Sequence, residues 1–400
     1  MHELAIPLLV GLIVVALAFD FLNGVHDAAN SIATVVATRL ISPVGAVALM
    51  FDFLNGLHDA ANSIATVVAT RVLSPVIAVG FAAFFNFAAY FLALKWPALH
   101  NVADTIGKGL VDKDVITPAV VFGALIGAMF WNVLTWVKGI PSSSSHALVG
   151  GIVGAGIAHA GFPSIQWVGL NKTLIAIVAS PTLGLVLTMG IMLLTSWLGS
   201  RASAQGAERT FRGLHLLSSG TLSLSHGLND AQKTMGLITV LLYSTGRLHG
   251  EFHVPNWVAL SCYVAMGLGT LTGGWRIIET MGTRITKLNQ HQGFSASMGG
   301  SVMLFSASYL GIPVSTTHTM TGCVIGAGAA RRASAVRWGI AGNVAVAWVI
   351  TIPCSAVVAA MFYWLISGSF LLDLIALAIL AAFAFVVSRL RKRRQQDPIV

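Results

Sequence analysis

Long apolar runs alternate with short polar clusters along almost the whole chain. Apolar segments of membrane-spanning length cover residues 5–22, 72–94, 116–137, 173–198, 255–272, 296–312, 338–365 and 370–388. Because a helix needs roughly 20 apolar residues to cross a bilayer, we expect these segments to be membrane helices. The pattern predicts an all-α polytopic membrane protein with about 11–13 membrane segments, some of them broken or re-entrant.

Three polar motifs occur once in each half of the chain, in the same order. They lie at residues 55–60, 104–107 and 139–146 in the first half, and at 226–231, 279–282 and 311–318 in the second. Asp230 follows Asp59 by 171 residues, and His318 follows His146 by 172. Repeated polar clusters inside apolar helices are typical of transporters built from two inverted-topology repeats, whose binding site lies where the repeats meet.

The repeat divides the chain into five predicted parts. They are 1–50, an N-terminal helix with a duplicated motif; 51–199, the first repeat; 200–216, a cytoplasmic connector; 217–366, the second repeat; and 367–400, an extra C-terminal helix with a basic tail.

The duplicated motif is a second, closer repetition near the start of the chain. Residues 19–39 are repeated almost letter for letter at 51–71. Asp59 of the later copy precedes His146 by 87 residues, close to the 88 that separate Asp230 from His318, so we assign the function to the copy at 51–71. A recent tandem duplication and an error in the assembled sequence both explain the earlier copy.

Composition excludes an ordinary soluble domain. Hydrophobic residues make up 56% of the chain, charged residues 9%, and the mean hydropathy is +0.82. The formal net charge of +9 is concentrated in polar stretches, at Arg201, Arg209 and Arg212 and at residues 391–394. The positive-inside rule therefore predicts a multi-pass protein of the inner or plasma membrane with a cytoplasmic C-terminal tail, and we expect no nucleic-acid partner.

Asp59 and Asp230 are the leading candidates for a coupling-ion site. An ionisable residue inside an apolar membrane segment is costly, so it usually marks an ion or substrate path. Carboxylates and amides beside loosened backbone suit Na⁺ or H⁺, whereas helix capping is the structural alternative. The coupling-ion candidates are Asp59, Asn55, Asn229 and Asp230.

The hydroxyl-rich motifs are candidates for an anion site. Proline followed by serine or threonine predicts a helix start, where unpaired N–H groups and the helix dipole attract anions. Capping by the hydroxyls is again the alternative, and His146 and His318 are read as structural partners. The anion-binding candidates are Ser142, Ser143, Ser144, Ser315, Thr316, Thr317, Asn62, Gln232 and Lys233, with the last also able to balance Asp230.

The third repeated motif contains Asp104 and Glu279. Each lies near a basic residue, Lys108 or Arg276. The pattern predicts either interfacial salt bridges or part of a gate. The three cysteines have no metal-binding or disulfide spacing, and we expect no cofactor and no metal beyond Na⁺.

These motifs resemble those of the inorganic phosphate transporter family, often called PiT. The resemblance covers roughly residues 51–366 and is carried by four segments: 55–66, 227–236, 131–146 and 313–318. It implies an all-helical transporter of two inverted repeats that imports phosphate with Na⁺ or H⁺. It also implies that the aspartate–amide motifs bind the coupling ion and phosphate, and that the hydroxyl-rich loops hold the anion.

Three alternatives to phosphate symport stay open at this point. A sulfate or other oxyanion permease is the nearest one. An intramembrane serine hydrolase would use a serine with His146 or His318, but we expect no enzyme because no third orienting group is evident. A passive anion channel would show flux that is independent of a cation gradient. The sequence also leaves a homo-oligomer open.

Overall fold

The computed structural model describes residues 43–96, 99, 101–201, 203–248 and 252–367, and in these ranges it is helical with no β-strand. The expected helices at 5–22 and 370–388, the motif copy at 19–39 and the basic tail lie outside the described residues. The first half comprises α3 (Pro43–Ala69), α4 (Pro75–Lys95), α5 (Asn101–Lys108), η2 (Lys113–Val115), α6 (Pro118–Lys138), α7 (Ser144–Ala160), η3 (Phe162–Ser164) and α8 (Trp167–Leu198).

The second half repeats this order of long and short helices. It comprises α9 (Ala204–Ser244), α10 (Asn256–Thr272), α11 (Trp275–Glu279), the π-helical η4 (Thr280–Arg284), α12 (Gln290–Tyr309), α13 (Thr316–Arg331), η5 (Ala333–Ala335) and α14 (Trp338–Ser367).

Two predicted boundaries differ from the structure. The helix that carries the first motif begins at Pro43, eight residues before residue 51, the predicted start of the first repeat. The expected connector at 200–216 is mostly helical, because Ser203 caps α9 by accepting a hydrogen bond from the Gly206 N–H at 3.2 Å. α8 ends at Leu198, and α9 begins at Ala204.

Several helices have the length and hydropathy of membrane spans. Four of them, α4, α6, α8 and α14, have mean hydropathies of 1.8–2.2, and α10 with α11–η4 forms a further span bent by 68°. This break is one of the broken helices that the sequence predicts. Three more helices exceed 18 residues: α3 and α9 carry the aspartate motifs, and α12 is rich in serine and glycine. The total of 11–13 membrane segments therefore stays a prediction.

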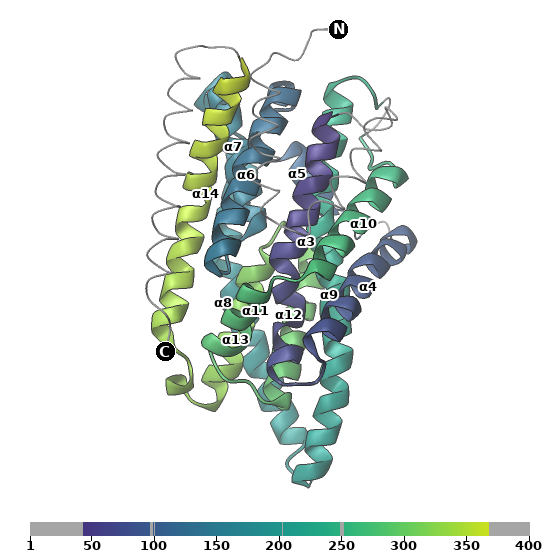
Figure 1. Ribbon diagram of the computed structural model, residues 1–400, viewed down its shortest axis with the longest axis vertical. Coiled ribbons are helices and arrows are strands. Elements are labelled where there is room, and N and C mark those ends of the chain that lie inside the picture. The colour runs from purple at the N-terminus through teal and green to yellow at the C-terminus, as the bar shows by residue number, and fades with distance from the viewer. Residues whose placement is uncertain (1–42, 97–98, 100, 202, 249–251, 368–400) are drawn as a thin grey trace.

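Helices of one half pack mainly on helices of the other (Figure 1). α14 lies against α7, and α8 lies against α13. In the same way α10 of the second half lies against α3 of the first, and α4 of the first half lies against α9 of the second. Glycines make these approaches possible, since a Cβ at any of them would overlap the backbone of the opposing helix. The glycines concerned are Gly150 and Gly154 on α7, Gly322 and Gly326 on α13, Gly56 on α3 and Gly227 on α9.

The corresponding helices α3 and α9 run antiparallel at the centre of the molecule. Near the start of α3, Asp52 accepts a hydrogen bond from Thr234 at 2.9 Å, late in α9. At the end of α3, Thr70 lies 3.3 Å from the Nδ1 of His215, early in α9. Equivalent helices of the two halves thus point in opposite directions.

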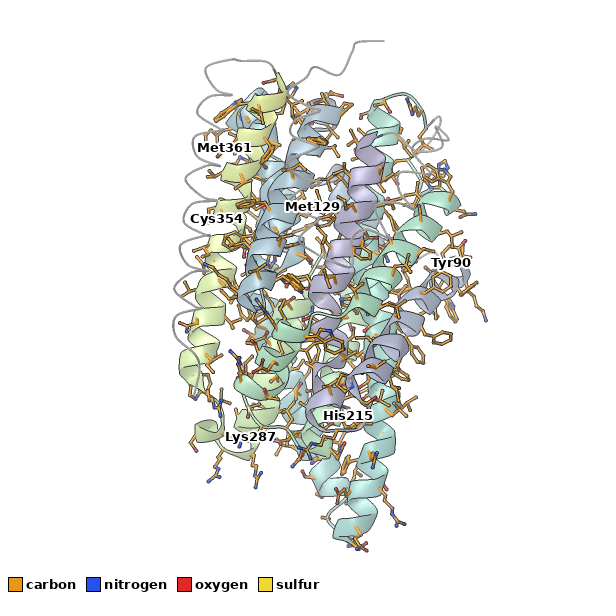
Figure 2. The ribbon with its side chains drawn as sticks, viewed as in Figure 1. Tyr90, Met129, His215, Lys287, Cys354 and Met361 are labelled. Atoms are coloured by element: carbon orange, nitrogen blue, oxygen red, sulfur yellow. The ribbon has the colours of Figure 1, made fainter. Side chains whose placement is uncertain are left out.

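One end of the molecule is strongly basic. The ends of α3, α8 and α13 meet the starts of α9, α12 and α14 there, and Figure 2 shows His215 and Lys287 at this end. The 41 residues of α9 span about 60 Å, twice the thickness of a hydrocarbon core, and its first turns extend beyond most other helices together with the end of α8 (Figure 1). The exposed basic residues at this end include Arg71, Arg201, Arg209, Arg212, Arg284, Lys287, Arg331, Arg332 and Arg337.

Candidate functional site

Both hydroxyl-rich motifs start a helix, as their proline and hydroxyl residues predict. Ser143 is the N-cap of α7, and its side-chain oxygen accepts a hydrogen bond from the His146 backbone N–H at 3.1 Å. Ser315 caps α13 in the same way and accepts from the His318 N–H at 3.1 Å. As acceptors these two hydroxyl oxygens stabilise the helix starts, and each hydroxyl keeps its own proton for a further hydrogen bond.

The loop in front of each of these helices is held by a threonine from the opposite half. Thr105 of α5 donates a hydrogen bond to the Gly311 carbonyl at 2.7 Å. Thr280 of η4 donates to the Gly139 carbonyl at 2.9 Å. Each threonine follows the acidic residue of its repeated motif, so in this motif the threonines position the loops.

Asp59 joins the starts of α7 and α13. Its Oδ2 accepts a hydrogen bond from the Ser144 hydroxyl at 2.6 Å, and its Oδ1 accepts one from the Thr317 hydroxyl at 3.1 Å. The Nδ1 of His58 lies 2.8 Å from the same Oδ1. One carboxylate thus holds a hydroxyl from each half of the chain.

Asp230 occupies the equivalent place on α9. Its Oδ2 accepts a hydrogen bond from the Thr316 hydroxyl at 3.0 Å, and the Nε2 of His226 lies 3.2 Å from that oxygen. Lys233 forms an ion pair with Oδ1. The same ammonium donates to the Ser145 hydroxyl at 2.6 Å, so the Asp230–Lys233 pair also reaches both helix starts.

The two carboxylates meet in one buried cluster. Ligand atoms of Asp59, His226 and Asp230 all lie within 4.8 Å of one another. Asn62 links the cluster to α13, because its Nδ2 donates to the hydroxyls of Thr316 and Thr317 at 3.0 Å each. All these side chains are buried. Carboxylate and hydroxyl oxygens suit a hard cation, and the hydroxyls also provide neutral donors for an anion.

Two histidines belong to the cluster although the sequence analysis assigned them no role. His58 directly precedes Asp59, and His226 lies one helical turn before Asp230. Both rings also lie near polar side chains of neighbouring helices, Thr135 of α6 at 3.2 Å and Asn86 of α4 at 3.1 Å. Ser142 lies behind His58, where it donates to Thr135 at 2.8 Å.

Two of the predicted ligands point elsewhere. Gln232 donates to the Leu99 carbonyl and accepts from the Val102 N–H at 3.2 Å, so it fixes the chain in front of α5. Asn229 donates to the Ser308 hydroxyl of α12 at 3.3 Å. Neither contact involves the two carboxylates.

Two further polar residues lie buried on α3. Asn55 is one turn before Asp59, on the same face of the helix. Asp52 is fully buried and, as described above, accepts a hydrogen bond from Thr234. The sequence analysis did not single out Asp52; its position inside the apolar start of the helix is the signal that would have found it.

The acidic residues of the third motif lie outside this cluster. Asp104 and Glu279 are exposed. Glu279 pairs with Arg284 at 2.8 Å, and both side chains are about half exposed (56% and 53%). The predicted partner, Arg276, instead donates to the Val137 carbonyl. An exposed pair of this kind contributes little to stability, and it fits the salt-bridge alternative better than the gate.

The geometry does not support the pairing of a serine with His146 or His318 that a hydrolase would use. The rings of His146 and His318 lie 4.6 Å apart, and no hydrogen-bond partner lies near the ring nitrogens of His146 in the described part of the chain. Ser144 donates to Asp59 and not to a histidine. A serine nucleophile needs a base within about 3.2 Å, whereas the serine nearest a histidine, Ser142, lies 3.4 Å from the Nε2 of His58 and donates its proton to Thr135 instead.

Known proteins resemble this chain over most of its length. A protein of Rhizobium meliloti (strain 1021) named probable low-affinity inorganic phosphate transporter is 59% identical over 361 residues, which cover 90% of this chain and 97% of the relative. A Bacillus subtilis (strain 168) protein of the same name is 40% identical and covers 92% and 100%. A solved structure, the sodium-dependent phosphate transporter, has 25% identity and a TM-score of 0.72, covering 81% of this chain and 98% of the other.

Residues 55–359 match the phosphate transporter family. This range contains both carboxylates and both capped helix starts, and the shared fold extends across the two halves. The chain is therefore a multi-pass membrane transporter and not an enzyme, and it belongs to the phosphate transporter family.

Proposed function

We propose that the chain is a secondary transporter that imports inorganic phosphate together with Na⁺ or H⁺ by alternating access. The names of its relatives and of its structural neighbour support phosphate as the substrate. The observation that carries the proposal is the meeting of Asp59 and Asp230, one from each half, at the starts of α7 and α13. The antiparallel course of α3 and α9 supports inverted repeats, with the site between them.

The hydrogen bonds at Asp59 explain how a cation and an anion are coupled. A hydroxyl group has one proton to donate, and Ser144 and Thr317 both give theirs to the Asp59 carboxylate. A cation or proton that binds this carboxylate replaces those two bonds. The hydroxyls are then free to turn toward an anion, so phosphate binds well only after the cation.

The anion ligands we propose are the hydroxyls of the two helix starts and Asn62. Serine and threonine donors at helix N-termini bind phosphate without a fixed positive charge. Lys233 has all three ammonium hydrogens engaged, and Gln232 faces the chain in front of α5, so neither is assigned to the anion. The proposed set is Ser142, Ser143, Ser144, Ser315, Thr316, Thr317 and Asn62.

Energetics require a coupling cation. Moving one negative charge inward against an inside-negative potential of 100 mV costs about 2.3 kcal/mol. Phosphate carries one to two negative charges near neutral pH, so accumulation needs a compensating positive charge that moves with it.

Transport by the purified protein in proteoliposomes tests the proposal. With Na⁺ and pH gradients imposed separately, we expect one of them to drive accumulation of ³²P-phosphate above the equilibrium concentration. Phosphate flux that is independent of both the Na⁺ and the pH gradient would indicate a channel. Stronger inhibition by sulfate than by unlabelled phosphate would indicate a sulfate carrier.

The charge distribution predicts the orientation. The positive-inside rule places the basic end in the cytoplasm. Asp114 lies at the other end, near the start of α8, since the neighbouring Asp112 N–H donates a hydrogen bond to the Ser164 carbonyl just before that helix. The test uses a variant whose three native cysteines have been replaced. In this background we expect Arg209→Cys to react with a membrane-impermeant thiol reagent only in inside-out vesicles, and Asp114→Cys to react only in right-side-out vesicles. The opposite pattern would reverse the assignment.

A further inference from the structure

The two carboxylate sites differ in fixed charge at one equivalent position. Asp59 and Asp230 are equivalent in the repeat, and so are Asn62 and Lys233, three residues after each aspartate. The first half therefore has an amide where the second half has an ammonium. Each aspartate also has one histidine contact, so the fixed positive charge of the lysine distinguishes the second site from the first.

Lys233 fills its site completely. Its Nζ forms an ion pair with Asp230 and donates to the Ser145 hydroxyl at 2.6 Å and to the Val314 carbonyl at 2.9 Å. An ammonium group has three donors, and these three oxygens use all of them. The side chain is fully buried, and these three protein oxygens satisfy its hydrogen bonds without a water molecule.

Asp59 has no such partner. Among the described residues, the ion pairs of this carboxylate involve His58 alone, and no lysine or arginine reaches it. Close to it, the Asn62 side chain carries an oxygen, Oδ1, that is buried without a hydrogen-bond partner. A carboxylate beside a free amide oxygen and two hydroxyls offers a place for a mobile cation.

The oxygens around Lys233 are those that a sodium ion would need. They come from a carboxylate, a hydroxyl and the unwound backbone before α13, which is the donor set of Na⁺ sites in transporters with broken helices. A tethered ammonium supplies the same single positive charge at the same place, but it cannot leave.

We propose that Lys233 is a tethered cation that fills, at Asp230, the place of an exchangeable Na⁺, so that this chain binds one exchangeable cation, at Asp59. The proposal rests on the transport function proposed above and makes Lys233 a residue that sets the number and kind of coupling ions. Each carboxylate then has one positive partner, but only the one at Asp59 moves across the membrane with phosphate.

The experiment counts sodium ions on the purified protein by equilibrium binding of ²²Na⁺. We expect the wild-type chain to bind no more than one Na⁺, and Lys233→Asn, which copies the first half, to bind one more. The reciprocal change, Asn62→Lys, tethers a cation at Asp59 and should remove the exchangeable one. Lys233→Arg keeps the charge and should leave the count at the wild-type value.

Two results would overturn the inference. One is a wild-type count of two Na⁺ per chain, a measurement that needs no variant to fold. The other is a Lys233→Asn protein that elutes as a folded monodisperse species, binds no additional Na⁺ and loses phosphate affinity, since Lys233 would then be an anion ligand. Phosphate uptake by the wild-type protein is measured in parallel, so that failure of the transport function itself is seen separately.

Discussion

Asp59→Asn is expected to reduce concentrative phosphate uptake at least tenfold while the protein still folds. The substitution keeps the shape of the side chain but removes the negative charge that attracts the cation and accepts the Ser144 and Thr317 hydroxyls. A hydrogen bond to a charged group contributes about 1.5–3 kcal/mol, and each 1.4 kcal/mol changes an affinity about tenfold. Uptake is measured in proteoliposomes under the driving gradient.

Asp114→Asn provides the matched control, because Asp114 is exposed in the short helix η2. We expect it to transport as the wild type does. Exchange of phosphate at equal concentrations on both sides should be measured as well. An Asp59→Asn protein that still accumulates phosphate at the wild-type rate would remove Asp59 from the coupling mechanism.

Gly269→Ala is expected to destabilise the protein strongly, although it adds a single methyl group. Gly269 lies where α10 crosses α3, and a Cβ there would overlap the Phe53 carbonyl oxygen and lie 2.8 Å from the Phe53 carbonyl carbon and 3.0 Å from the Leu57 nitrogen. These are backbone atoms, which cannot move without shifting the helix that carries Asp59. Overpacking of this kind costs about 1–3 kcal/mol or more.

The same helix offers the control, Gly267→Ala. A Cβ at Gly267 would lie 3.6 Å from the Ala83 carbonyl oxygen, which is ordinary contact. We expect a melting temperature several degrees below wild type in detergent for Gly269→Ala, with reduced uptake, and a nearly unchanged one for Gly267→Ala. Equal melting temperatures of the two variants would show that α3 and α10 have room for a methyl group at Gly269.

The repeat made the centre of the site predictable. Two motifs at equal spacing placed Asp59 and Asp230 in equivalent positions, and proline before hydroxyl residues identified the starts of α7 and α13. These features depend on chain position and on local capping chemistry, which a sequence shows directly. The helical class followed from apolar run length in the same way.

Side-chain direction around a helix was not predictable in the same way. His58 and Asn229 are equivalent in the repeat, and so are Asn55 and His226, so histidine and asparagine have exchanged places between the halves. Both histidines still contact their aspartate, one from the adjacent position and the other from one turn away. The neighbour that a flanking residue contacts depends on packing between distant helices. The sequence therefore did not indicate that Gln232 bonds the chain in front of α5.

The crossed packing of the halves has a consequence for biosynthesis. Gly150 and Gly154 of α7 fit against the backbone of α14 at Ile352 and Ala356, and α14 is the last described helix to leave the ribosome. Until then the first half inserts into the bilayer with its closest packing surface facing lipid. The hydroxyls at the start of α7 therefore reach their final places only after the second half has been translated, and a half produced alone has no partner for this surface.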